Sequence, residues 1–171
     1  MISRGYLRDD GLWDIEGEIV DEKTYASTVR ERGALPARTP YHDMCVRVTI
    51  DDDMTIRAIE ASMPAKPFNY CAGVIEPLQR LVGLSLARGF RRKLGEAIGG
   101  EQGCTHLRDL ILAVATTAHQ TIFSYRAEFE PERADAMEHG DTPPFFINGC
   151  HTWDEKSPVV AIYYPKFHRK P

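Results

Sequence analysis

The segment 41–63 constrains the fold most, because two alternating stretches flank a run of three aspartates. In the first stretch, YHDMCVRVTI (41–50), every second residue from Met44 to Ile50 is hydrophobic. A period of two is typical of a strand with one buried face. The second stretch, TIRAIEASM (55–63), returns after the DDD turn with strand-forming residues. We therefore predict an antiparallel hairpin over 41–63.

Further elements are predicted on both sides of this hairpin. The alternating segment 11–23 indicates a strand, with Trp13, Ile15 and Ile19 on its inward face. The Gly-, Pro- and Arg-rich segment 30–40 is typical of a loop. Helical spacing of apolar residues and the positions of turn residues predict helices over 69–83, 84–100, 104–129 and 131–140. A last apolar segment, 159–165, is predicted to be a strand.

The order of these elements predicts the fold class. Strands come first and helices follow, which favours an α+β fold. We expect a small antiparallel sheet, built from the hairpin 41–63 and the N-terminal strand, with helices packed on one face. The longest helix has an apolar stripe that is expected to be buried: Leu107, Leu110, Ile111, Val114, Ala118 and Ile122.

The length and the charge of the chain limit the classes of protein to which it can belong. The 171 residues suit one domain over 1–171. The net charge of −4 and the lack of a basic stripe argue against a nucleic-acid partner. No apolar run is long enough to span a bilayer, so no membrane partner is expected. The start MISRGYLRDD has no apolar secretion signal, which predicts a cytoplasmic protein.

The cysteines are the strongest chemical signal. They stand at positions 45, 71, 104 and 150, widely and irregularly spaced. In a reducing compartment, disulfides are not expected, which leaves buried thiols, metal ligands or a nucleophile. The stretch GCTHL places Cys104 two residues before His106 at the start of the longest helix, and Cys71 lies at the start of an earlier helix.

These residues suggest a site at the starts of several elements. A helix N-terminus favours the thiolate form of a cysteine, and thiolates bind zinc. The candidate metal ligands are Asp43, Cys71, Cys104 and His106, and His42, Asp43 and His106 are the candidate acid–base residues. Without a metal, Cys104 or His106 would serve as nucleophile or base. The remaining alternative is that the cysteines only pack as small hydrophobic residues.

Several motifs also resemble a known family. GLWDIEG, HDM, GCTHL and CHTW, spread over nearly the whole chain, resemble a bacterial family catalogued as a domain of unknown function. The last motif contains Cys150 and His151, in a loop rich in aromatic residues. The resemblance implies one structural unit and supplies no activity.

The order of elements over about 41–125 is similar to that of iron–sulfur cluster scaffold proteins. Those proteins use an aspartate, a cysteine after the sheet and a cysteine at the next long helix. This likeness implies that Asp43 or His42 converges with Cys71, Cys104 and His106. The sequence departs from the pattern in two ways: His42 replaces a cysteine beside Asp43, and His106 follows its cysteine instead of preceding it.

Two functions remain open at this point. The first is an enzyme that acts on a small-molecule substrate by lyase or hydrolase chemistry, with zinc as the one cofactor considered, because the sequence has no fingerprint of an organic cofactor. Aromatic residues near the candidate site suggest an aromatic substrate: Trp13, Tyr41, Phe68, Tyr70, Phe90 and Phe145. The second is an accessory protein that delivers a metal or an iron–sulfur cluster to a partner. A homodimer, paired through the strand predicted over 159–165, is a further expectation.

Overall fold

The computed structural model describes every residue except Arg88 and Pro171. The chain divides into two compact units, Met1–Thr121 and Ile122–Pro171, which are described separately. One helix, α2 (Thr105–Phe129), contributes residues to both units. The single domain expected over 1–171 stays a prediction.

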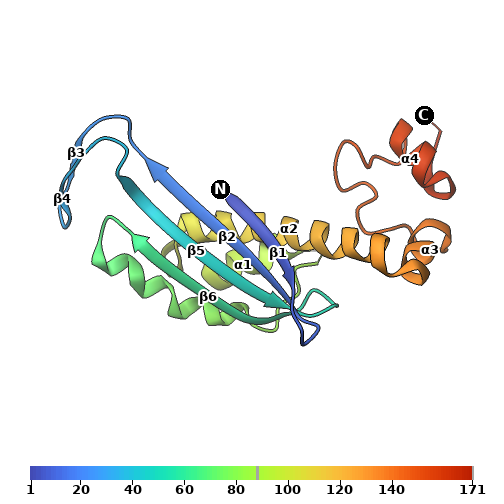
Figure 1. The fold of residues 1–171 in the computed structure, drawn as a ribbon, viewed down its shortest axis with the longest axis horizontal. Helices are drawn as coiled ribbons and strands as arrows, with labels where there is room; N and C mark the ends of the chain where they lie inside the picture. Colours follow the sequence, from blue (N-terminus) through green and yellow to red (C-terminus); the bar gives the residue numbers. More distant parts are fainter. Residues whose placement is uncertain (88, 171) are drawn as a thin grey trace. The chain divides into compact units, whose positions relative to one another are not determined.

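The first unit is built on a four-stranded antiparallel sheet in the order β1-β2-β5-β6 (Figure 1). The strands are β1 (Ile2–Leu7), β2 (Trp13–Glu22), β5 (Pro40–Ile50) and β6 (Ile56–Ala65). The expected α+β class, the hairpin and the N-terminal strand are confirmed. Strand β1 was not expected, because ISRGYL lacks a regular apolar alternation.

A second, two-stranded sheet lies between β2 and β5 in the chain, and one of its strands falls within the segment 30–40 that was expected to be a loop. It pairs β3 (Ser27–Val29) with β4 (Gly33–Leu35). Each strand has only three residues, too few to show a period in the sequence. The β3–β4 hairpin can therefore be recognised only from the pairing of its strands in the structure.

The helical part of the first unit begins with two 3₁₀ turns, η1 (Asn69–Val74) and η2 (Glu76–Leu81). The helix expected over 69–83 is divided near Pro77, which lacks an N–H and stands in the first turn of η2, and both parts are 3₁₀ rather than α-helical. Phe68 precedes η1 and makes no side-chain cap hydrogen bond.

Two α-helices complete this unit. Helix α1 (Phe90–Ile98) begins six residues later than the helix expected over 84–100, and a short 3₁₀ turn, η3 (Gly100–Gln102), leads to α2. In the part of the chain that the structure describes, the helices lack the combined length and apolarity that a bilayer crossing requires.

Helices α1 and α2 lie on one face of the four-stranded sheet (Figure 1). A Cβ atom added at Gly17 in β2 would lie 2.6 Å from Val114 Cγ2 and 3.0 Å from Leu110 Cδ1. A side chain at position 17 would therefore push the helix away from the sheet. The expected inward faces are confirmed, and these residues are among those buried: Trp13, Ile15, Ile19, Met44, Val46, Val48, Ile50, Leu107, Leu110, Ile111, Val114, Ala118 and Ile122.

Asp51 organises the turn between β5 and β6. Its Oδ1 accepts hydrogen bonds from the backbone N–H groups of Asp53 at 3.0 Å and Thr55 at 2.9 Å. Arg57 Nε donates to the other carboxylate oxygen at 2.8 Å. One side chain thus satisfies two backbone donors that the tight turn leaves without a strand partner.

The second unit contains α3 (Pro131–His139), α4 (Pro158–Tyr163) and the 3₁₀ turn η4 (Pro165–Phe167). The strand expected over 159–165 is wrong. Ser157 caps α4 by accepting a hydrogen bond from the Val160 N–H at 3.1 Å, and Pro158 fits the first helical position. A short apolar run does not distinguish a strand from a helix by periodicity alone. The edge pairing expected for a dimer therefore has no strand to carry it.

Candidate metal centre

The candidate centre begins with a cross-strand pair on the inward face of the sheet. Asp21 in β2 lies opposite His42 in β5. Both continue the alternation that buries Ile19 and Met44, so their side chains project to the helix-covered face. His106, in the first turn of α2, reaches the same place.

The three side chains are close enough to share one ion. His42 Nδ1 lies 3.0 Å from each carboxylate oxygen of Asp21, and the backbone N–H of His42 donates to Oδ1 at 2.7 Å. His106 Nε2 lies 3.7 Å from Asp21 Oδ2. The two imidazole centroids are 3.9 Å apart, with the rings inclined at 32°. One ligand atom from each residue falls within 4.8 Å of the others.

The three side chains of the centre differ in their exposure to solvent. The side-chain exposure is 16% for His42, 34% for His106 and 47% for Asp21. Burial acts to raise the pKa of Asp21, but hydrogen bonds from the His42 ring and amide, with the charges of His42 and His106, lower it overall. The carboxylate is therefore ionised and offers oxygen ligands on the exposed side of the cluster.

Cys104 contacts the opposite side of the His106 ring. Its Sγ lies 3.9 Å from Nδ1, whereas Nε2 is the nitrogen that faces Asp21. Cys104 directly precedes α2, and its carbonyl accepts a hydrogen bond from the Arg108 N–H at 2.9 Å. The helix start thus holds the thiol and the imidazole on one turn.

The other predicted ligands lie elsewhere. Asp43 pairs with Val20 and Ala65, and its position in the alternation places it on the sheet face opposite to His42. Cys71 lies half-buried in η1. Neither residue belongs to the Asp21–His42–His106 cluster.

Asp21 was missed at the sequence level, although a signal was present. It occupies the next inward position after Trp13, Ile15, Gly17 and Ile19, where a carboxylate is out of place on an apolar face. An ionisable residue at such a position needs a partner. The sequence did not reveal that partner, because the register of β2 against β5 pairs residues 21 positions apart.

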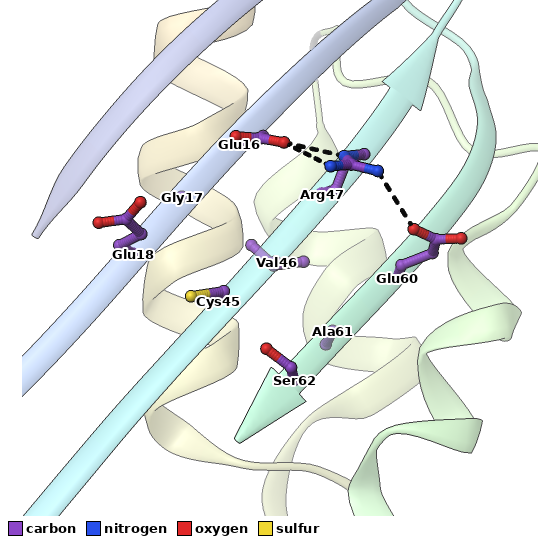
Figure 2. Close-up of a pocket in the computed structure, with 9 residues that line it drawn as sticks. All are labelled: Glu16, Gly17, Glu18, Cys45, Val46, Arg47, Glu60, Ala61 and Ser62. Carbon is purple, nitrogen blue, oxygen red and sulfur yellow. Dashed lines mark hydrogen bonds and ion pairs between the residues drawn. The ribbon is translucent and has the colours of Figure 1, made fainter. Parts of the chain in front are cut away.

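A shallow groove of about 290 Å³ lies on the opposite face of the sheet (Figure 2). Arg47 lies between Glu16 and Glu60 in its lining (Figure 2), with Nη2 2.8 Å from Glu16 and Nη1 3.6 Å from Glu60. Cys45 also lines the groove, and burial, together with the charges of Asp43 and Glu18, raises the pKa of its thiol. The Cys45 thiol is therefore held in its protonated form near neutral pH.

The aromatic residues do not gather at the centre as a group. Trp13 and Phe90 are buried in the core, Tyr70 is 92% exposed, and Phe145 belongs to the second unit. The Tyr41 ring faces Lys23, whose Nζ lies 3.6 Å from the ring centroid.

The motif with Cys150 and His151 lies in the second unit, where both residues are exposed. Its loop is closed by backbone hydrogen bonds, from Asn148 N–H to Trp153 O at 2.7 Å and from Trp153 N–H to Cys150 O at 3.1 Å. Phe146 packs against Trp153, with ring centroids 4.7 Å apart. The half-buried Phe146 and Trp153 also contact the Tyr164 ring, so these three aromatic residues form a cluster within the second unit.

Comparison with known proteins places the chain in a family. Residues 1–120 match the family described as protein of unknown function (DUF2889). The chain belongs to this family. The matched DUF2889 region corresponds closely to the first compact unit and includes Asp21, His42, Cys104 and His106. No curated protein and no solved structure gives a significant match.

Proposed function

We propose that this DUF2889 protein is a metal-dependent enzyme whose centre is formed by Asp21, His42 and His106. The convergence of these three side chains, from two strands and a helix, is the observation that carries the proposal. Two imidazoles and one carboxylate form a common donor set of catalytic zinc sites, which keep a further position open for water or substrate.

The distances fit such a centre. With zinc bonds of about 2.0–2.1 Å, ligand atoms in a tetrahedral site lie about 3.3 Å apart. The separations from the Asp21 carboxylate are 3.0 Å to His42 Nδ1 and 3.7 Å to His106 Nε2. Small side-chain rotations would therefore complete the site, and zinc would replace the proton that His42 shares with Asp21.

The exposure of the three residues favours catalysis over a purely structural ion. His42 anchors the buried side of the cluster, while the half-exposed Asp21 leaves an approach from solvent. A bound zinc ion would act as a Lewis acid and polarise a carbonyl or hydroxyl group of a small substrate. We propose hydrolysis or lyase cleavage of such a substrate, since both reactions proceed without an organic cofactor.

The binding test is a calorimetric titration of zinc into metal-free protein. Wild type is expected to bind one zinc per chain, and His42→Ala or His106→Ala is expected to abolish tight binding. His151→Ala is the matched control, because His151 is exposed in the second unit. Equal binding by all four proteins would overturn the proposed centre.

The activity test uses p-nitrophenyl acetate as an activated ester probe. The zinc-loaded wild type is expected to hydrolyse it faster than His106→Ala does at the same zinc concentration. Zinc-independent hydrolysis that is lost in Asp21→Asn would instead assign the reaction to His42 as a general base oriented by Asp21. Zinc binding without hydrolysis of this or other activated carbonyl probes would count against the enzyme.

An accessory protein is the second candidate, and the exposure of Asp21 favours it. A ligand that is 47% exposed offers a route by which an ion can pass to a partner. This function predicts rapid transfer of bound zinc to a chelator, or labile sulfide in anaerobically purified protein. Slow zinc release together with ester hydrolysis would favour the enzyme.

A further inference from the structure

We propose that Cys104 is a positioning residue that holds the His106 imidazole from outside the coordination sphere, instead of serving as a metal ligand. This inference rests on the proposed metal centre and assigns a role to the thiol beside it. It depends on which ring nitrogen each neighbour contacts.

The two nitrogens of His106 face different partners. Nε2 lies 3.7 Å from Asp21 Oδ2, and the His42 ring lies against the His106 ring with the two centroids 3.9 Å apart. Nδ1 lies 3.9 Å from Cys104 Sγ. The lone-pair directions of the two nitrogens diverge across the ring, so an ion held by Nε2 and Asp21 lies on the far side of the imidazole from the thiol.

The contact selects a tautomer. When Nε2 binds a metal, Nδ1 carries the ring proton, and its N–H can donate to the Cys104 sulfur. Metal-bound histidines commonly donate their other N–H to a carboxylate, a backbone carbonyl or water, which fixes the ring orientation, and we propose that the Cys104 sulfur takes this place for His106. Sulfur is a weak acceptor, so a serine hydroxyl at position 104 would perform the same task.

The main experiment compares wild type, Cys104→Ala and Cys104→Ser, with Cys150→Ala as a control for loss of an exposed cysteine. Zinc affinity is measured by competition with a chromophoric chelator. Cys104→Ala is expected to weaken zinc binding on the order of tenfold, as outer-shell changes do. Cys104→Ser is expected to bind within a few-fold of wild type, and Cys150→Ala is expected to match it.

Cobalt(II) gives a spectroscopic readout of the ligand set. A thiolate ligand produces an intense sulfur-to-cobalt charge-transfer absorption in the near ultraviolet. Wild-type protein loaded with Co²⁺ is expected to lack this band. An intense band that disappears in Cys104→Ala and Cys104→Ser would show that Cys104 is a ligand and would overturn the inference. Unchanged zinc affinity in Cys104→Ala would overturn it as well.

A metal-free measurement separates this inference from the proposed function. The ¹⁵N chemical shifts of the imidazole rings report the tautomer of each histidine. In metal-free wild type and Cys104→Ser, the neutral His106 ring is expected to carry its proton on Nε2, which faces the Asp21 carboxylate, while Nδ1 accepts a hydrogen bond from the thiol or hydroxyl at position 104. Cys104→Ala is expected to lose part of this preference. If this pattern holds while no metal binds, the metal centre fails and the positioning role stands. If zinc binds but the tautomer of His106 does not respond, the positioning role fails alone.

Discussion

Asp21 and His42 face each other across β2 and β5, with the imidazole Nδ1 3.0 Å from both carboxylate oxygens. This pairing places two polar side chains at the end of an apolar strand face, where they form two of the three members of the proposed metal centre. Helix α2 supplies the third member, His106, whose ring lies against that of His42 at a centroid distance of 3.9 Å. The sheet register and the start of α2 together therefore define the centre.

The close approach of α2 to the sheet predicts a packing defect for Gly17→Ala. The added Cβ would lie 2.6 Å from Val114 Cγ2, so helix or strand must shift. We expect a loss of about 1–3 kcal/mol in the free energy of unfolding, measured by urea denaturation. Val114→Ala removes the clashing methyl group, and the double variant is expected to lose less stability than the sum of the two single changes.

A glycine in open space provides the control for this experiment. A Cβ at Gly95 in α1 would meet no atom within 4 Å. Gly95→Ala is therefore expected to leave the stability unchanged or to increase it, because alanine favours the helix. Equal destabilisation by both substitutions would contradict the packing account.

The hydrogen bonds in the turn between β5 and β6 predict that Asp51 contributes strongly to the free energy of unfolding. Replacing it with alanine removes the acceptor for the Asp53 and Thr55 amides and the ionic partner of Arg57. We expect Asp51→Ala to reduce the free energy of unfolding by about 1–3 kcal/mol, again measured by urea denaturation. Asp53→Ala, an exposed change in the same turn, is expected to have a much smaller effect.

The contribution of Asp51 also depends on pH. Burial acts to raise the pKa of this carboxyl, but the hydrogen bonds from Thr55, Arg57 and Asp53 and the charge of Arg57 hold it below its ordinary value. A folded-state pKa below the unfolded value stabilises the protein above the unfolded pKa, and this stability is lost as pH falls through the folded value. The stability difference between wild type and Asp51→Ala is therefore expected to be constant near neutral pH and to shrink below about pH 4. A difference that grows on acidification would contradict the assignment.

Local periodicity was enough to predict the sheet hairpin and the buried stripe of α2. The positions from Met44 to Ile50 and from Leu107 to Ile122 carry that pattern within one element each, so no distant contact is needed to recognise it. Periodicity failed for α4, because its short apolar run fits a strand as well as a helix. The cap at Ser157 is what favours the helix there.

The candidate site was predicted only in part, because it depends on contacts between elements. His42 and His106 were recognised as chemistry-bearing residues at element starts, and the structure brings them together. Asp43 was chosen as the carboxylate because it opens a strand with His42 and matches the aspartate of the iron–sulfur scaffold pattern, but adjacent residues in a strand point to opposite faces. The carboxylate on the correct face, Asp21, is contributed by another strand, and only the register shows this.

Asp21 and Asp43 offer a matched pair for the most direct test of the metal centre. Both are aspartates in paired strands of one sheet, on opposite faces, and Asp21 alone belongs to the histidine cluster. The measurement is the zinc content of wild type, Asp21→Asn and Asp43→Asn after equilibration with zinc and removal of free ions, by plasma mass spectrometry. We predict about one zinc per chain in wild type and Asp43→Asn, and loss of zinc in Asp21→Asn. Retention of zinc in Asp21→Asn, or its loss in Asp43→Asn alone, would contradict the account.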